Sequence, residues 1–153
     1  MYNWEGEVPT EEYLIPFGKA DIKRDGSDVS LVTYAKPLRI TLEAAEKLSQ
    51  KGISAEVVDV RSLRPLDSQT VVDSVKKTNR CVIVDESWPV VSFGSYLGCL
   101  ISQQCFDYLD APVELVQSED VPFPYNHTLE LSAQPNVEKI ISAVDRCLYR
   151  EKG

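Results

Sequence analysis

The sequence predicts an α/β protein in which a mostly parallel sheet carries helices on both faces. From Lys19 onward, short apolar runs of the length of buried strands alternate with longer segments of helix-forming residues. A right-handed crossover joins strand, helix and parallel strand, and it lays each helix on a face of the sheet. The last segment shows the helical period most clearly, because its apolar residues fall on one face. These residues are Val137, Ile140, Ile141, Val144 and Leu148.

The first elements are set by strand composition and by turn and cap residues. Residues 19–23 (KADIK) form a short strand candidate, and after a turn residues 28–35 (DVSLVTYA) have the composition of a buried strand. The turn alone suggests that these two strands are neighbours in the sheet. Pro37 suits the first turn of a helix, where the amide hydrogen that proline lacks is not needed. Residues 38–50 are helix formers, and Gly52 ends that helix.

The remaining elements continue the alternation of strand and helix. Asp67 is a plausible cap for the second helix, and Pro135 or Asn136 opens the last one. In chain order we expect a strand at 55–60 (AEVVDV), a helix at 68–78, a strand at 81–85 (CVIVD), a helix at 93–108, a strand at 113–117 (VELVQ) and a terminal helix.

Two further parts of the chain lack a regular period. Residues 1–18 are rich in Glu, Pro and Gly, and we interpret them as an extended lead-in at the end of a linker, so the chain is expected to be a fragment of a longer subunit. Residues 19–150 then form the folded domain, and residues 151–153 form a tail.

Residues 118–135 contain three prolines. A loop of that length inside a compact domain is usually a functional surface.

Composition and charge exclude several classes of function. Hydrophobic residues make up 43% and charged residues 26% of the 153 residues, which is typical of a soluble folded domain. The net charge of −8, without a basic run, argues against nucleic acid and anionic membrane as partners and favours a basic protein surface. No stretch is long and apolar enough for a membrane span, and we expect no export signal.

The cysteines and the single histidine predict no metal site. Cys81, Cys99, Cys105 and Cys147 contain no C-x-x-C pair, and only His127 could join them at a metal. We therefore expect all four to be buried free thiols in a reducing compartment. His127 lies in the proline-rich loop, far in sequence from any candidate nucleophile, so we expect it to be exposed rather than catalytic.

The common nucleotide and hydrolase motifs are absent, and the local candidates for chemistry are weak. Glycines at the start of a helix can offer amide hydrogens to an anion, so Gly94 to Gly98 form one candidate anion site. The alternative is that Gly94 and Gly98 let the helix lie close to the sheet. Asp85 and Glu86 end a strand, and because neighbours on a strand point to opposite faces, we expect a solvated edge rather than a shared-proton pair.

Asp110 is the remaining acidic candidate. It lies in the turn Leu109-Asp110-Ala111-Pro112, where a helix ends and the helix dipole disfavours negative charge. An acidic residue in this electrostatically unfavourable position can be one that binds a partner, or it can be an ordinary turn aspartate. The pattern alone leaves both interpretations open.

Seven segments occur in a characteristic order over nearly the whole chain, from Leu14 to Leu148. They are IPFGKADIKRDGSDVSLVTYAKP, VVDVRSLRPLD, KKTNRCVIVDESWP, FGSYLG, FDYLDAPV, DVPFPYN and QPNVEKIISAV. In these segments the chain resembles the carboxyl-terminal, transketolase-like domain of the beta subunit of pyruvate dehydrogenase, the thiamine-dependent first component of the 2-oxo acid dehydrogenase complexes. Arg64-Pro65-Leu66-Asp67, Ser87-Trp88-Pro89 and residues 120–125 look more like the pyruvate enzyme than the branched-chain one.

The resemblance implies a three-layer α/β/α domain with a five-stranded mixed sheet whose first strand is antiparallel. It implies that thiamine diphosphate and magnesium bind in the whole enzyme, between the alpha subunit and the amino-terminal, pyrimidine-binding domain of the beta subunit. The diphosphate motif of that family is absent here, so we expect this domain to bind neither group and to hold no catalytic residue. The whole heterotetramer would decarboxylate pyruvate oxidatively and transfer the acetyl group to lipoamide, and residues 1–18 would be the linker from the missing domain.

The resemblance also implies partners and a location. The partners are the alpha subunit, a second beta subunit and the peripheral subunit-binding domain of dihydrolipoamide acetyltransferase, and Asp110 corresponds to an acidic residue that contacts this last partner. Because a domain separated from its tetramer leaves apolar interface open, we expect an exposed patch that includes Trp88, Pro122, Phe123, Pro124 and Tyr125. Residues 149–153 extend beyond the usual end of relatives, which bears on docking through a terminal carboxylate. The compartment would be the mitochondrial matrix or a bacterial cytoplasm, and a free-standing anion-binding or nucleotide-binding module at Gly94 to Gly98 is the alternative.

Overall fold

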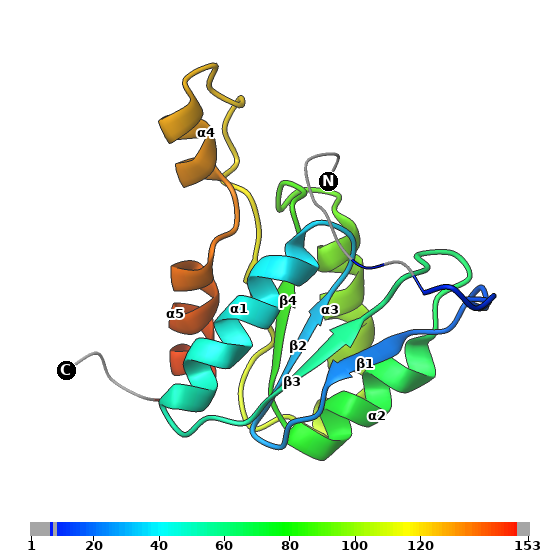
Figure 1. Ribbon diagram of the computed structural model, residues 1–153. Coiled ribbons are helices and arrows are strands. Elements are labelled where there is room, and N and C mark those ends of the chain that lie inside the picture. The colour runs from blue at the N-terminus through cyan, green and yellow to red at the C-terminus, as the bar shows by residue number, and fades with distance from the viewer. Residues whose placement is uncertain (1–6, 8, 150–153) are drawn as a thin grey trace.

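The computed structural model describes residue 7 and residues 9–149, so residues 151–153 of the expected tail and much of the start of the lead-in lie outside the described residues. One five-stranded sheet lies between two layers of helices (Figure 1). The strands are β1 (Asp21–Arg24), β2 (Val29–Thr33), β3 (Ala55–Asp59), β4 (Cys81–Val84) and β5 (Glu114–Val116). The helices are α1 (Pro37–Gln50), α2 (Ser68–Thr78), α3 (Phe93–Gln104), the 3-10 turn η1 (Phe106–Tyr108), α4 (His127–Ala133) and α5 (Val137–Cys147).

The sheet has the mixed topology that the family resemblance implied. Its order is β1-β3-β2-β4-β5, with β1 antiparallel to β3 and every other pair parallel. The expectation from the turn alone, that β1 and β2 are neighbours, is wrong. After β1 the chain crosses the start of β3 closely, since a Cβ on Gly26 would lie 2.2 Å from the amide nitrogen of Glu56. The amides of Ser27 and Asp28 then donate to the carbonyl oxygen of Ser54, at 3.0 and 2.8 Å, which fixes this crossing.

Two apolar clusters fill the space between the sheet and the helices. Helices α1 and α5 pack on one face, where Leu48, Ile53, Ile140 and Val144 are almost fully buried. Helices α2 and α3 pack on the other face. In the described part of the chain, no helix is long and apolar enough to cross a bilayer.

Local caps explain the helix boundaries that were predicted correctly. Oδ1 of Asp67 accepts from the amide of Thr70 at 3.3 Å and starts α2, and Oδ1 of Asn136 accepts from the amide of Lys139 at 2.9 Å and starts α5. The helix expected at 93–108 ends at Gln104, and the chain continues into η1. Helix α4 lies inside the segment that was expected to be a loop.

Three of the four cysteines are buried thiols, as expected, but Cys99 is exposed on α3. The helical position of Cys99 turns its side chain away from the sheet, whereas Leu97 and Ile101 on the same helix are fully buried. The expectation that all four are buried is therefore wrong for this residue.

Candidate interaction surfaces

Asp110 lies on a turn that is tied to the end of α2. Its amide donates to the carbonyl oxygen of Asn79 at 2.9 Å, and Nδ2 of Asn79 donates to the carbonyl oxygen of Tyr108 at 2.8 Å. Asn79 adopts a left-handed conformation (φ 61°) that ends α2 and points the chain toward this turn. Two hydrogen bonds with Asn79, one donated by Asp110 and one accepted by Tyr108, thus fix the backbone of this turn.

The carboxylate of Asp110 faces a cation within the same chain. Its Oδ2 lies 3.0 Å from Nη2 of Arg80, while 54% of the aspartate side chain stays exposed. The hydroxyl of Tyr149 donates to the carbonyl oxygen of Asp110 at 3.0 Å. Arg80 offsets the unfavourable position of an acid at the end of a helical segment, so the turn is stable without a partner and still presents its charge to solvent.

A hollow of about 520 Å³ lies beside this turn. Phe106 and Tyr149 line it with largely exposed rings, and Pro112 and Leu109 complete an apolar wall next to the Asp110 carboxylate. An acidic group beside exposed aromatic and apolar side chains is an arrangement suited to a basic protein surface.

The proline-rich segment forms an arm that stands away from the body of the molecule. We define the arm as residues 119–134, and Figure 1 shows that it rises beyond the carboxyl ends of the strands and carries α4 at its tip. Between residues 119 and 132 no side chain is buried. Exposed apolar residues of this arm are Val121, Phe123, Tyr125, Leu129 and Leu131.

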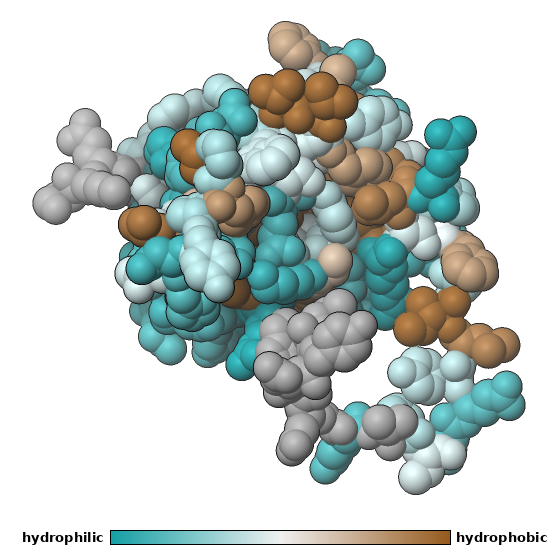
Figure 2. Space-filling model, turned by 90° about the horizontal axis from the view of Figure 1, so that it is seen from above, coloured by the Kyte–Doolittle hydropathy of each residue, from teal (hydrophilic) through white to brown (hydrophobic). Residues whose placement is uncertain are grey.

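The predicted interface residues lie on this arm and on the neighbouring loop. The rings of Trp88 and Phe123 are tilted against each other with centroids 6.2 Å apart, and each is about half exposed. Pro122 is exposed, Pro124 is half-buried and Tyr125 is fully exposed. The predicted exposure is confirmed for Trp88, Pro122, Phe123 and Tyr125 and only in part for Pro124, while their role in an interface stays a prediction. Figure 2, which looks down onto this end, shows brown apolar side chains at the surface among hydrophilic ones.

The loop after Trp88 adds backbone strain to this surface. Val91 has φ 57°, a left-handed conformation that is costly for a β-branched residue, and 98% of its side chain is exposed. Val90 is also exposed. Because neither side chain gains burial in return, the loop contributes little to the stability of the isolated chain, which favours a role in contacts with another molecule.

The base of the arm is closed by Lys139 of α5. Its Nζ donates to Oε1 of Glu119 at 2.8 Å, to the carbonyl oxygen of Ser132 at 3.0 Å and to that of Gln134 at 3.3 Å. The amide of Glu119 also donates to the carbonyl oxygen of Ala133 at 2.8 Å. These contacts join the outgoing and returning stems of the arm, so its direction is fixed at the base although its tip has no core.

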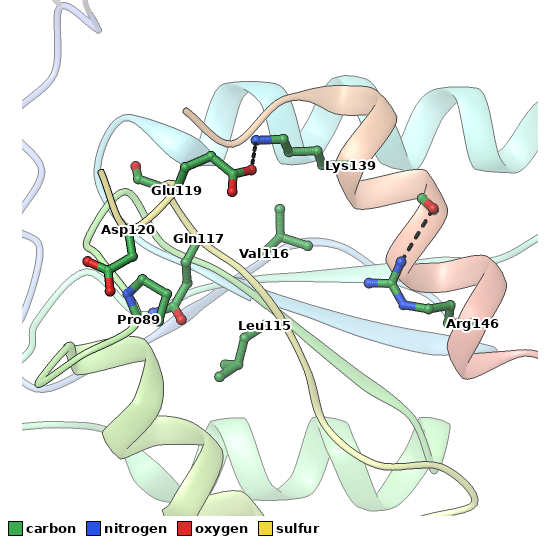
Figure 3. Close-up of a pocket in the computed structure, with 10 residues that line it drawn as sticks. Pro89, Leu115, Val116, Gln117, Glu119, Asp120, Lys139 and Arg146 are labelled. Carbon is green, nitrogen blue, oxygen red and sulfur yellow. Dashed lines mark hydrogen bonds and ion pairs between the residues drawn. The ribbon is translucent and has the colours of Figure 1, made fainter. Parts of the chain in front are cut away.

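A hollow of about 590 Å³ runs along β5 and the flank of α5 (Figure 3). Figure 3 shows Leu115 on one side and Lys139 and Arg146 on the other, with Glu119 pointing to Lys139. Arg146 pairs with Glu114 at 2.6 Å and Lys139 with Glu119 at 2.8 Å. These cations are already paired within the chain, so the hollow has the character of a surface groove rather than of a reactive site.

Asp85 differs from the sequence expectation, because it is buried rather than part of a solvated edge. Its Oδ1 accepts from the hydroxyl of Tyr34 at 2.6 Å and from the amide of Ser87 at 3.0 Å, and its Oδ2 accepts from the amide of Gly94 at 3.0 Å. Burial alone would raise the pKa of Asp85, but these hydrogen bonds together hold it below its ordinary value. Burial and the hydrogen bond to Asp85 raise the pKa of Tyr34.

The same contacts argue against an anion site at Gly94 to Gly98. The amide of Gly94 donates to Oδ2 of Asp85, and the amide of Ser95 donates to Oγ of Ser92, the residue that caps α3, at 3.0 Å. A carboxylate of the chain therefore occupies the place that a bound anion would take. The close-packing alternative fits, since a Cβ on Gly94 would lie 2.8 Å from Oδ2 of Asp85.

His127 is exposed, as expected. Its side chain is 81% exposed at the first residue of α4, and Nδ1 lies 3.9 Å from Oε2 of Glu130. No group of three or more His, Cys, Asp and Glu gathers anywhere in residue 7 and residues 9–149.

The comparison with known proteins identifies the class. Residues 18–140 match the family described as Transketolase, C-terminal domain. The match covers most of the chain, so this chain belongs to the transketolase C-terminal domain family. A solved structure described as "Split gene transketolase, inactive beta4 tetramer" superposes with a TM-score of 0.75 at 26% identity, over 96% of this chain and 47% of that one.

Within the family, the resemblance to pyruvate dehydrogenase beta subunits is confirmed. The chain is 40% identical to the mitochondrial pyruvate dehydrogenase E1 component subunit beta of Dictyostelium discoideum over 99% of the chain. It is 42% identical to the pyruvate dehydrogenase E1 component subunit beta of Rickettsia felis over 97% of the chain. It is also 45% identical, over 92% of its length, to the beta subunit of acetoin:2,6-dichlorophenolindophenol oxidoreductase of Bacillus subtilis. It spans 44%, 46% and 41% of these three relatives, respectively.

Proposed function

We propose that this chain acts as the docking and assembly domain of the beta subunit of a pyruvate dehydrogenase. In this proposal the Asp110 turn receives the peripheral subunit-binding domain of dihydrolipoamide acetyltransferase. The arm and the Trp88 loop contact the alpha subunit or a second beta subunit. Relatives named as mitochondrial and relatives from bacteria support the mitochondrial matrix or a bacterial cytoplasm as the compartment.

The observation that carries the docking role is a half-exposed carboxylate on a fixed turn beside an apolar hollow. A basic domain approaching this surface finds the charge of Asp110 and the rings of Phe106 and Tyr149 within one hollow. The net charge of −8 adds a long-range attraction that speeds the encounter. The contact at Asp110 would then decide how long the complex lasts.

Kinetic measurements on Asp110→Asn test this role. The 153-residue chain, alone and mixed with the alpha subunit, is immobilised, and the subunit-binding domain is passed over it at low and high salt. If the contact is buried, Asp110→Asn should cost about 2 to 5 kcal/mol of docking energy, mainly through faster dissociation. Asp107→Asn on the exposed face of η1 removes the same charge nearby and should change only the salt dependence of association. An unchanged dissociation rate in Asp110→Asn removes Asp110 from the docking surface.

Substitutions on the arm test the assembly role. Tyr125→Ser removes a fully exposed ring, so it should leave the free energy of unfolding of the chain within about 0.5 kcal/mol of the parent and weaken assembly with the alpha subunit. Phe106→Ser removes an exposed ring at the opposite end of the molecule and should leave assembly unchanged. Sedimentation at several concentrations separates the two effects, and equal assembly of both variants with the parent would contradict the proposed interface.

The reaction itself belongs, in this proposal, to the whole enzyme. Thiamine diphosphate and magnesium would be held outside the described residues, and the isolated chain should decarboxylate no pyruvate. Titration calorimetry checks this, and micromolar binding of the cofactor to the isolated chain would overturn it. The acetoin:2,6-dichlorophenolindophenol oxidoreductase subunit is as similar to this chain as the pyruvate dehydrogenase subunits are. The assembled enzyme should therefore be assayed with both pyruvate and acetoin.

A further inference from the structure

Arg80 is held against the docking turn from inside the fold. It connects α2 to β4, and its carbonyl oxygen accepts from the amide of Ser30 at 2.9 Å and from the hydroxyl of Thr78 at 3.0 Å. Both donor residues are buried, Ser30 on β2 and Thr78 at the end of α2. The backbone of Arg80 is therefore fixed to the core, while the end of its side chain reaches Asp110.

The contact between Arg80 and Asp110 is incomplete on both sides. Nη2 of Arg80 lies 3.0 Å from Oδ2 of Asp110, and the Nε of Arg80 is buried without a hydrogen-bond partner in the described part of the chain. In the same part of the chain, Oδ1 of Asp110 accepts no hydrogen bond. An arginine that leaves a buried donor unpaired is a poor choice for stability, so its role is more readily explained by the carboxylate that it faces.

We propose that Arg80 is an internal competitor for the Asp110 carboxylate and weakens the docking of a basic partner. This inference rests on the proposed docking function of Asp110. A basic side chain of the partner must either share the carboxylate with Arg80 through Oδ1 or displace Arg80 from Oδ2. In both cases two like charges approach the same group, and the repulsion between them subtracts from the attraction.

The proposal predicts that removing the charge of Arg80 tightens docking. For two largely solvated unit charges about 6 Å apart, with an effective dielectric constant of about 40 to 80, the repulsion corresponds to about a three- to tenfold change in the dissociation constant. Arg80→Gln should tighten binding by that factor at low salt, and the gain should shrink at high salt because exposed charges are screened. Arg80→Lys keeps the charge and should bind like the parent.

The test uses the same immobilised chain and the same subunit-binding domain. The variants are Arg80→Gln, Arg80→Lys, Asp110→Asn and the double variant of Arg80→Gln with Asp110→Asn. Lys47→Gln is the matched control, because it makes the same change in net charge on α1, on the other face of the sheet. In the double variant the gain from Arg80→Gln should fall below about twofold, because the carboxylate for which Arg80 competes is gone.

The outcomes separate this inference from the docking proposal. If Asp110→Asn weakens docking but Arg80→Gln leaves it unchanged or weakens it, only the role of Arg80 is overturned. If Lys47→Gln tightened docking as much as Arg80→Gln does, the change in net charge alone would explain the effect, and the proposed role of Arg80 would again be overturned. If Asp110→Asn binds like the parent, both proposals fail together.

Discussion

The hydroxyl of Tyr34, just after β2, donates to Oδ1 of Asp85, just after β4, at 2.6 Å. The other carboxylate oxygen of Asp85 accepts from the amide of Gly94 at the start of α3. One buried carboxylate thus joins the ends of two adjacent strands to the beginning of a helix. The Trp88 loop runs between these points, so the position of that loop depends on this carboxylate.

The low pKa of Asp85 predicts a specific loss of stability in acid. A group whose pKa is lower in the folded state stabilises the fold above its unfolded pKa of about 4, and this contribution is lost as the pH falls through the folded value. The difference in free energy of unfolding between the parent and Asp85→Asn should therefore be constant from about pH 5 to 8 and shrink below about pH 4. Urea unfolding at several pH values measures it, and a difference that persists to about pH 2 would contradict the assignment.

Tyr34 predicts the opposite dependence in alkali. Burial and the hydrogen bond to Asp85 raise its pKa, so its contribution is complete below about pH 10 and is lost as the pH rises further. Tyr34→Phe should be less stable than the parent at neutral pH and should lose less stability between about pH 9 and 11. If the free energy of unfolding fell equally with pH in the two proteins over this range, the fold would not be raising the pKa of Tyr34.

Two glycines of α3 form a matched pair. A Cβ on Gly94 would lie 2.8 Å from Oδ2 of Asp85 and 3.0 Å from Nε2 of Gln117, whereas a Cβ on Gly98 would find its nearest neighbour, Cδ2 of Leu115, at 3.6 Å. Gly94→Ala should therefore lower the free energy of unfolding by about 1 to 3 kcal/mol. Gly98→Ala should raise it by about 0.5 to 1 kcal/mol, because alanine is the better helix former. Denaturant unfolding of both variants checks the pair, and equal effects would mean that Gly94 is not held against Asp85.

The cysteines should differ in reactivity. Cys99 is exposed, while burial raises the pKa of Cys81 and Cys105 and raises that of Cys147 to about 11. We expect a thiol reagent to label Cys99 alone in the folded chain and all four cysteines after unfolding. Mass spectrometry of the labelled peptides identifies the sites, and rapid native labelling of Cys147 would contradict the packing of α5 on the sheet.

The arm should be the least protected structured part of the isolated chain. Helix α4 has only seven residues, a length that is marginal for a helix without tertiary packing, and the arm buries no side chain between residues 119 and 132. Amide hydrogens of α4 should exchange much faster than those of α5. Lys139→Met should speed exchange across the arm, whereas Lys47→Met should not. Equal protection of α4 and α5 would show that the arm is held by more than its base.

What the sequence predicted well depends on local interactions. The bounds of α2 and α5 follow from Asp67 and Asn136, whose side chains bind amides three residues later. Helix α4 was missed because seven residues are too few to show a helical period. A local signal existed, since the side chain of Asn126 accepts from the amides of Thr128 and Leu129.

What the sequence could not predict depends on residues that only the fold brings together. Neither the charge of Arg80 nor that of Asp110 indicates that the end of α2 meets the turn before β5. Asp85 has the pattern of a solvated strand end, and its burial follows from Tyr34 and Gly94, which reach it from other elements. The pairing of β1 with β3 is long-range in the same way.

The position of β1 has a consequence for solubility. It covers the edge of β3, a strand whose five residues are all buried and which would otherwise offer a row of open backbone groups to other molecules. In its place β1 presents Asp21, Lys23 and Arg24, and charged residues on an edge strand discourage edge-to-edge aggregation. A chain shortened past Arg24 would keep the fully buried residues of both apolar clusters, lose Ala20 and Ile22 from the edge of one of them, and expose β3. It should precipitate at concentrations where a chain beginning at Gly18 stays monodisperse.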